Sequence, residues 1–209
     1  MILLLISLLT GSPDPTPAEL LEKVHACYRE TKDLSALFTQ TVTLRYQKKG
    51  QTVTGAVKVR TGNKFRLESD RQTIVTNGTT TWMYDPSTKQ VLKSPFKKGG
   101  KQMTPDKFLL GLPKELNPKS VERSGDRMVL TVEPAAGSAL ATMIVQARLW
   151  TDPSTGSFDK IEYSDKNGTV YSTVLTDVKI NAGIPDSAFE FMVTPEMRVV
   201  DMSAGHPAP

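Results

Sequence analysis

Short segments of alternating apolar and polar residues, separated by turn signals, constrain the fold of this 209-residue chain most strongly. In residues 53–60, Val53, Val57 and Val59 alternate with Thr54, Lys58 and Arg60, which places these valines on one face of a strand. Asn77-Gly78 and Asn167-Gly168 each lie between two such segments. Asn-Gly is typical of tight β-hairpin turns, because both turn positions need positive φ. The sequence therefore predicts a sheet built from hairpins.

About ten segments at hairpin spacing are predicted to be strands of one antiparallel meander. They are residues 38–44, 53–60, 64–68, 74–75, 80–84, 128–132, 143–150, 158–163, 169–178 and 189–193. A sheet of this size has an apolar face that must be covered. We therefore expect it to curl, with helices over its concave side. The pattern is compatible with a filled core and with a hollow one.

Two amphipathic helices are predicted to provide this cover. Thr16 and Glu19 have the spacing of a capping box at the start of the first helix, which extends to about Glu30. Thr104 and Pro105 are typical of the start of a shorter second helix. That second helix has a strongly apolar turn, consisting of Phe108, Leu109, Leu110 and Leu112.

The N-terminus begins with an apolar segment, ILLLISLL, at residues 2–9. It is too short to cross about 30 Å of hydrocarbon, and its length and the small residues that follow are typical of a signal peptide. A buried first strand is the alternative. The predicted organisation is a signal-peptide remnant at residues 1–12, a single domain at residues 13–202 and a disordered tail at residues 203–209.

Composition and residue spacing argue against catalysis, metal binding and nucleic-acid binding. The net charge of +4 is mild for a nucleic-acid-binding protein. His25 and His206 are the only histidines, and Cys27 is the only cysteine, so no internal disulfide can form. No nucleophile motif and no metal-ligand spacing is present. We expect no enzyme activity, no cofactor and no bound metal.

Several segments together resemble the family of periplasmic carriers of outer-membrane lipoproteins, the LolA family. The segment KDLSALFTQTVT, residues 32–43, contains the family's Phe38 and Gln40. Gly55, Asn63 and Phe65-Arg66 follow in the family's order. The segments TIVTNGTTTWMYDPSTKQV and IPDSAFEFMVTPEMRVVD, residues 73–91 and 184–201, are similar to its hairpin and its closing strand. Order and spacing agree over residues 16–202.

The resemblance implies an unclosed antiparallel β-barrel of about ten or eleven strands, with short helices as a lid over an apolar cavity. It implies a monomeric periplasmic carrier that shuttles triacylated lipoproteins. An inner-membrane ABC-type extractor would supply the cargo, and an outer-membrane lipoprotein acceptor would receive it. The alternative is a lipoprotein or lipid sensor or acceptor of the same fold, without a shuttle role.

Candidate site residues combine this resemblance with strand alternation. The predicted lipid-binding residues are Phe65, Leu67, Trp82, Tyr84, Phe108, Leu109 and Leu112. The family has Arg-Pro where this chain has Thr61-Gly62, and the family's arginine holds the lid shut. Arg60 is the candidate for lid control in its place. Alternation turns Arg60 to the other face of the sheet unless a bulge intervenes.

Overall fold

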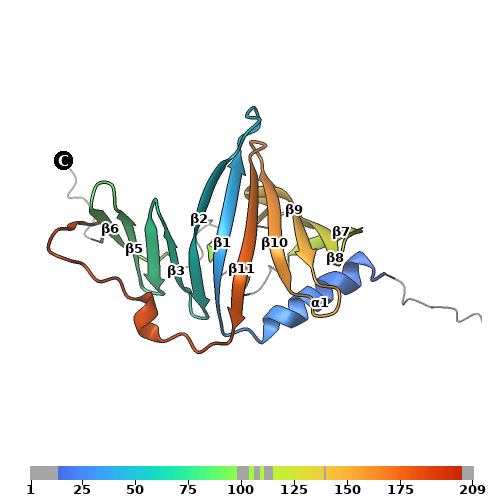
Figure 1. Ribbon diagram of the computed structural model, residues 1–209, viewed down its shortest axis with the longest axis horizontal. Coiled ribbons are helices and arrows are strands. Elements are labelled where there is room, and N and C mark those ends of the chain that lie inside the picture. Colours follow the sequence, from blue (N-terminus) through green and yellow to red (C-terminus); the bar gives the residue numbers. More distant parts are fainter. Residues whose placement is uncertain (1–13, 98–103, 106–108, 111–114, 139, 204–209) are drawn as a thin grey trace, which may run out of the picture.

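The computed structural model describes residues 14–97, 104–105, 109–110, 115–138 and 140–203, so the predicted signal segment and most of the tail lie outside the described residues (Figure 1). A single twelve-stranded sheet dominates these residues. Its strands are β1 (Asp33–Thr43), β2 (Gln51–Arg60), β3 (Lys64–Ser69), β4 (Thr73–Asn77), β5 (Thr80–Asp85), β6 (Gln90–Pro95), β7 (Leu116–Ser124), β8 (Arg127–Pro134), β9 (Ile144–Thr151), β10 (Phe158–Asp165), β11 (Val170–Ile180) and β12 (Arg198–Asp201).

The sheet consists of two meanders that meet at β1. The strand order is β12-β6-β5-β4-β3-β2-β1-β11-β10-β9-β8-β7, and every pair is antiparallel except β12 with β6. In the described sheet, β12 and β7 are the two edges and do not pair with each other. The sheet curls without closing, and β7 and β8 turn toward the back of the view (Figure 1). The predicted mainly-β, unclosed antiparallel architecture is confirmed.

Strand prediction was wrong at the C-terminal end of the chain. Phe189, the first residue of the predicted strand 189–193, ends a 3-10 turn instead, η2 (Asp186–Phe189). Residues 190–195 take no part in the sheet. The strand lies later, at β12, and it pairs with β6 in parallel. The alternating aromatic residues of this segment therefore serve to cover a sheet face and not to form a ladder.

Strands β6 and β7 were missed because their alternation is weak. β7 is an edge strand with mostly polar residues, and its register against β8 shifts between Pro118 and Ser120. Proline cannot donate to a ladder, so it is confined to edges and bulges of sheets. The short strand β6 contains only two apolar residues before its terminal proline, Val91 and Leu92.

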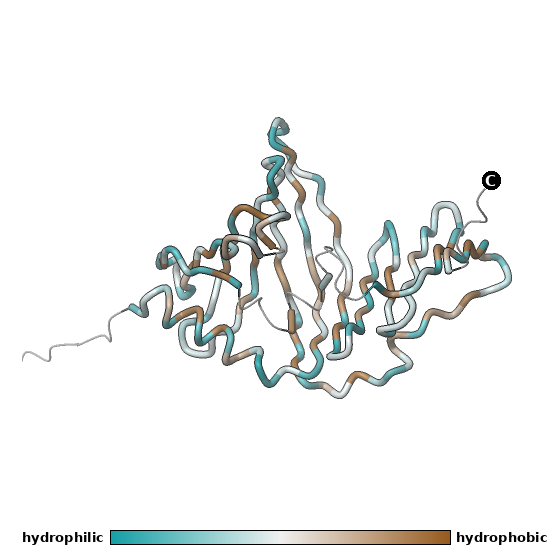
Figure 2. The backbone as a smooth tube through the Cα atoms, turned by 180° about the vertical axis from the view of Figure 1, so that it is seen from behind, coloured by the Kyte–Doolittle hydropathy of each residue, from teal (hydrophilic) through white to brown (hydrophobic). Residues whose placement is uncertain are grey.

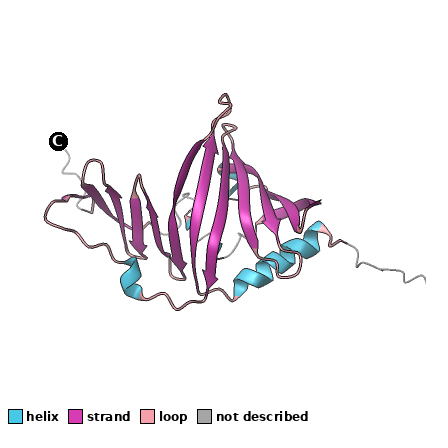
Figure 3. Ribbon diagram, in the orientation of Figure 1, coloured by secondary structure: helices cyan, strands magenta, loops and turns pink. Residues whose placement is uncertain are grey.

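Helix α1 (Pro17–Arg29) packs its apolar stripe onto the β7–β10 half of the sheet (Figures 1 and 3). The predicted capping box is present: Thr16 Oγ1 accepts from the Glu19 N–H at 3.3 Å, and Glu19 Oε2 accepts from the Thr16 N–H at 2.8 Å. The Tyr28 ring lies 5.0 Å from that of Phe158. The described residues contain no helix with the length and apolar character needed to cross a membrane.

Of the predicted second helix, only Thr104, Pro105, Leu109 and Leu110 are described. Leu109 is buried in the main hydrophobic cluster, and Leu110 packs against that cluster. Apolar and polar residues alternate along the strands of the backbone (Figure 2). The residues of the main hydrophobic cluster on β1, β2, β8, β9 and β10 lie on one side of the sheet, where α1 closes the core.

Candidate functional site

A continuous row of apolar side chains crosses the concave face of the sheet. Strand register places these residues directly opposite one another, in the order Ala36, Val57, Leu67, Ile74, Met83 and Leu92. Residues that face each other across antiparallel strands project to the same side of the sheet. We call these six residues the apolar row. The parallel pairing of β12 adds Val200 beside Leu92.

The apolar row runs from the covered core to an open edge. Ala36 and Val57 are buried, whereas Met83 and Leu92 are 41% and 38% exposed. Phe65 lies on the same face, because it stands two residues before Leu67 on β3 and pairs with Val59, two residues after Val57 on β2. Phe65 is buried in the main cluster. A contiguous apolar surface that becomes accessible at one end is typical of a binding site for an apolar ligand.

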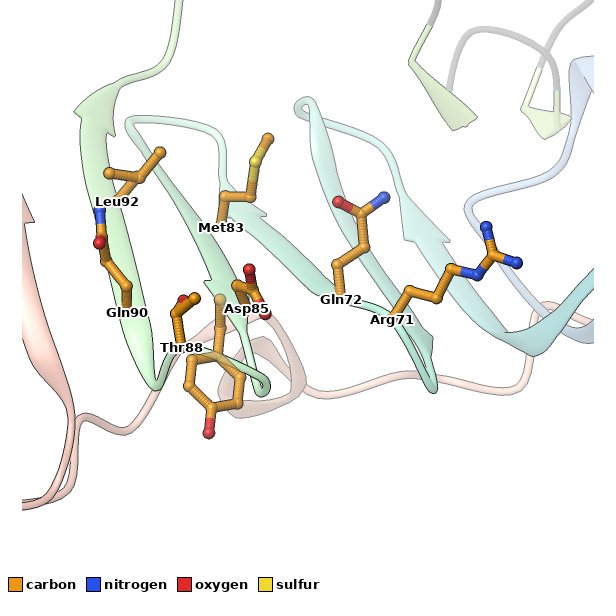
Figure 4. Close-up of a pocket in the computed structure, with 8 residues that line it drawn as sticks. Arg71, Gln72, Met83, Asp85, Thr88, Gln90 and Leu92 are labelled. Atoms are coloured by element: carbon orange, nitrogen blue, oxygen red, sulfur yellow. The ribbon is translucent and has the colours of Figure 1, made fainter.

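A pocket of about 310 Å³ lies at the open end of the row (Figure 4). It is lined by Arg71, Gln72, Met83, Tyr84, Asp85, Thr88, Gln90 and Leu92. In Figure 4, Met83 and Leu92 project to the same side of their strands, next to one another. The volume is at the lower end of the range for small-ligand pockets, about 300–1,000 Å³. A larger ligand would therefore have to extend along the row toward Leu67.

Trp82 and Tyr84 lie on the opposite, convex face of the sheet. Trp82 pairs with Val75, which itself pairs with Arg66, the neighbour of Phe65 on the other face. The Tyr84 ring lies 5.8 Å from that of Phe191. Trp82 and Tyr84 share a face with each other, as predicted, but not with Phe65 and Leu67. The prediction that Trp82 and Tyr84 line one site together with Phe65 and Leu67 is therefore corrected, because the two pairs lie on opposite faces of the sheet.

The convex face of β2–β6 is covered by residues 181–197, which we call the C-terminal segment. Phe189 is fully buried there, as are Val75 and Val91 beneath it. Arg60 Nη1 donates to the Ile184 carbonyl at 3.0 Å, and Arg66 Nη1 donates to the Glu190 carbonyl at 3.2 Å. This face is thus already occupied by the chain itself.

Asp186 anchors the C-terminal segment through two cations. Its carboxylate accepts from Lys64 Nζ and, at 3.1 Å, from Arg60 Nη1. The hydrogen bond from Lys64, with the nearby charge of Arg60, lowers the pKa of Asp186 below its ordinary value. The carboxylate therefore stays ionised, and the ion pairs persist, over the physiological pH range.

Polar side chains also occur on the concave face, beside the apolar residues of the central strands. Gln40 Nε2 donates to Thr173 Oγ1 at 3.0 Å. The rings of Tyr163 and Tyr171 stack with their centroids 4.7 Å apart. Burial, with the neighbouring Tyr171, raises the pKa of Tyr163 to about 12.

Among the described residues, no group of three or more His, Cys, Asp or Glu side chains is placed to hold a metal ion.

The family model described as outer membrane lipoprotein carrier protein LolA matches residues 29–192. This span covers most of the sheet and the C-terminal segment up to Met192.

The chain belongs to the LolA family.

This LolA family member is similar to a named carrier and to solved structures of other bacterial proteins. An outer-membrane lipoprotein carrier protein of Methylobacillus flagellatus is 27% identical over 185 residues, 84% of this chain and 86% of the relative. A conserved protein of Thermus thermophilus has a similar solved structure, with a TM-score of 0.55 and 13% identity, covering 88% of this chain and 98% of the other. A LolA superfamily protein from Nitrosomonas europaea aligns with a TM-score of 0.47 and 14% identity, over 85% and 98% of the two chains.

Arg60, the residue predicted to control the lid, points to the convex face of the sheet. It pairs with Lys64 and follows Val59, without a register shift between β2 and β3, so it points away from the concave face. Its contacts are with Ile184 and Asp186. Arg60 therefore fastens the C-terminal segment to the convex face of the sheet, and lid control by Arg60 stays a prediction.

Sequence reasoning missed Ile74, Met83 and Leu92, the outer residues of the apolar row. The hairpin at Asn77-Gly78 carried the signal, since a tight turn there pairs odd-numbered residues of one strand with even-numbered residues of the next. Following that rule from Ile74 leads to Met83, whereas the step from Leu67 to Ile74 depends on the separate register of β3 with β4. Of the residues that were predicted, Phe65, Leu67 and Leu109 do come together in or against the main cluster. Phe108 and Leu112 lie outside the described residues.

Proposed function

We propose that this protein is a periplasmic carrier that binds the acyl chains of triacylated lipoproteins and moves the lipoproteins from the inner to the outer membrane. The observation that supports the proposal is the apolar row, open to solvent at Met83 and Leu92 in a chain of the LolA family. The relative from Methylobacillus flagellatus, whose similarity covers 84% of this chain, is named an outer-membrane lipoprotein carrier protein.

The proposed binding surface combines the row with the predicted residues that share its face. Acyl chains would contact Met83 and Leu92 at the open edge and extend toward Leu67. Phe65 and Leu109 would form the inner wall, with Phe108 and Leu112 as further proposed lining residues. Methionine suits such a site because its flexible side chain adapts to chains of different shape.

Energetics explain why a carrier of this kind would need no catalytic group. Each CH₂ removed from water contributes about 0.8 kcal/mol, so three acyl chains exposed to water would be strongly unfavourable. Transfer from a bilayer to an apolar protein surface is close to neutral, because both are dry. Loading would therefore be driven by an inner-membrane ABC-type extractor. Unloading would need only an outer-membrane acceptor with a better site.

A hydrolytic enzyme is less well supported by the same residues. Cys27 packs against the core from α1, and burial raises the pKa of its thiol, which disfavours the nucleophilic thiolate. A hydrolase would release free fatty acid from its ligand, whereas a carrier would return the lipoprotein at its original mass.

The test is uptake of a triacylated lipopeptide, measured by native mass spectrometry. Leu92→Glu should abolish uptake, because a carboxylate would stand at the open end of the row. The matched control is Leu37→Glu, at a residue of β1 that is 50% exposed on the convex face. Equal uptake by the Leu92→Glu protein and the wild type would refute the assignment of the site.

A second measurement separates the carrier from a sensor or acceptor of the same fold. The loaded protein is mixed with vesicles that bear a lipoprotein acceptor, and the lipopeptide is followed by flotation. A carrier should release its cargo to the acceptor, whereas a sensor should keep it. Retention of cargo in the presence of a competent acceptor would contradict the shuttle role and favour the sensor.

A further inference from the structure

Two hairpin loops lie side by side at one end of the sheet. Residues 44–50 connect β1 to β2, and residues 165–169 comprise the last residue of β10 and the turn that leads to β11; together we call these two loops the hairpin tip. Strands β1 and β11 pair up to Thr43 and Val170, directly below the loops. Gly168 packs so closely on Arg45 that an added Cβ would lie 2.9 Å from Arg45 Cδ. Figures 1 and 2 both show the tip projecting beyond the neighbouring strands.

The hairpin tip concentrates positive charge. Its four cations, all exposed, are Arg45, Lys48, Lys49 and Lys166. The one carboxylate of these two loops, Asp165, accepts hydrogen bonds from the N–H groups of Asn167 and Thr169 at 2.8 and 2.9 Å. Four positive charges less one negative give the tip a net charge of +3, compared with +4 for the whole chain. Within the described part of the chain, none of the four cations forms an ion pair.

The same tip exposes two large apolar side chains. Tyr46 is 90% exposed and Leu44 is 47% exposed, so neither is held in the core. The Arg45 guanidinium carbon lies 5.6 Å from the Tyr46 ring centroid. An amphipathic ring surrounded by cations is typical of a segment that lies at the headgroup level of a membrane.

We propose that the hairpin tip docks this protein on the surface of an anionic phospholipid bilayer. Tyr46 and Leu44 would enter the headgroup region, and the four cations would contact lipid phosphates. A tip that projects beyond the neighbouring strands can reach a flat bilayer without hindrance from the rest of the sheet. The proposal goes beyond the carrier function, because the tip can bind a bilayer whether or not the apolar row holds a lipoprotein.

Flotation of the unloaded protein with vesicles tests the proposal. The protein should float with vesicles that contain phosphatidylglycerol and not with vesicles of phosphatidylcholine alone. Raising the ionic strength from about 0.1 M to about 1 M should release it, since the Debye length falls from about 10 to about 3 Å. Failure to float with phosphatidylglycerol vesicles at the lower salt would overturn the proposal. A tip that binds an acidic protein and not a bilayer would give this result.

Variants of exposed residues locate the binding to the tip. Lys48→Ala with Lys49→Ala should weaken binding about 25-fold, or fivefold per cation, the factor that corresponds to about 1 kcal/mol each. Arg29→Ala with Lys179→Ala removes the same net charge from exposed sites away from the tip and should leave binding nearly unchanged. Equal losses in the two double variants would show a general charge effect and refute a dedicated tip.

The aromatic contribution is tested at Tyr46. Tyr46→Ser should weaken binding to phosphatidylglycerol vesicles, whereas Tyr46→Trp should preserve it, because tryptophan is also favoured at the bilayer interface. Both substitutions are at a side chain that is nearly fully exposed, so the melting temperature should not change. Wild-type binding by Tyr46→Ser would contradict insertion of this ring.

Discussion

Arg60 Nη1 lies 3.1 Å from Asp186 Oδ1 on the convex face of the sheet, while Phe65, on the neighbouring strand, points to the concave face. The two faces of this half of the sheet therefore have different tasks. The convex face is closed by the C-terminal segment, whose Phe189 is fully buried. The concave face keeps Met83 and Leu92 accessible. Attachment of the C-terminal segment and binding on the apolar row should thus be separable by mutation.

Asp186→Asn should loosen the C-terminal segment without affecting lipopeptide uptake. The substitution removes the charge that Lys64 and Arg60 share, so backbone amides of residues 184–191 should exchange faster with deuterium. The matched control is Glu22→Gln, at an exposed carboxylate of α1 that pairs with Arg29 at 3.1 Å. Unchanged exchange at residues 184–191 in the Asp186→Asn protein would contradict the anchoring role.

The same carboxylate predicts an acid dependence. Its pKa is lower in the folded protein than the ordinary value of 3.8, chiefly through the Lys64 hydrogen bond. The ionised form thus stabilises the folded state above the ordinary pKa, and this contribution is lost as the pH falls below about 4. Hydrogen exchange of the C-terminal segment should therefore rise at low pH in the wild type. In Asp186→Asn it should already be high at neutral pH and vary less.

Gly55→Ala should destabilise the fold through a close contact that has no room for a methyl group. Gly55 pairs with Phe38, and a Cβ at this position would lie 2.8 Å from Phe38 Cε1 and would also collide with the Glu68 carbonyl. Overpacking of this kind costs about 1–3 kcal/mol. Urea unfolding measures the loss, with Thr54→Ala, at the exposed neighbouring position, as the control. A loss no larger than that of the control would show that the sheet relaxes around the added methyl.

Sequence patterns predicted the fold well where a signal was local. Asn77-Gly78 marked a real hairpin, Thr16 and Glu19 marked the start of α1, and the valines of β2 do face the core. The site was harder to predict because it depends on register across several strands. Alternation correctly placed Trp82 and Tyr84 on one face of β5. Relating that face to the face of Phe65 required the register of β3 with β4 and then that of β4 with β5.

Residues whose role depends on distant partners were the ones that sequence reasoning misassigned. Phe189 alternates with Phe191 as a strand residue would, yet it lies fully buried in a 3-10 turn that contacts β3 and β4 of the folded sheet. Arg60 likewise finds Asp186 across more than a hundred residues of chain. Such contacts have no local signature, because the intervening chain decides which segments meet.

A tryptophan at position 83 should report ligand binding, whereas the natural tryptophans should not. Trp82 lies on the convex face, as does Trp150, whose ring is covered by Lys160 with Nζ 3.9 Å from the centroid. Acyl chains on the apolar row would contact neither ring. Brominated lipopeptide should therefore quench the fluorescence of the Met83→Trp protein strongly and that of the wild type only slightly. Comparable quenching in the wild type would place the ligand on the convex face.

Alkaline pH should destabilise the protein through Tyr28. Its hydroxyl accepts from the Phe158 N–H at 3.4 Å, and burial raises its pKa to about 12 from an ordinary value of 10.0. The folded state therefore keeps a proton that the unfolded state loses, so this residue's contribution to stability is complete below pH 10 and falls as the pH rises toward 12. Two pH units correspond to a loss of about 3 kcal/mol at most. Urea unfolding between pH 8 and pH 11 measures it. Tyr28→Phe keeps the ring contact with Phe158 and should reduce the slope, while Tyr46→Phe, at an exposed ring, should not; equal slopes for both variants would contradict the assignment to Tyr28.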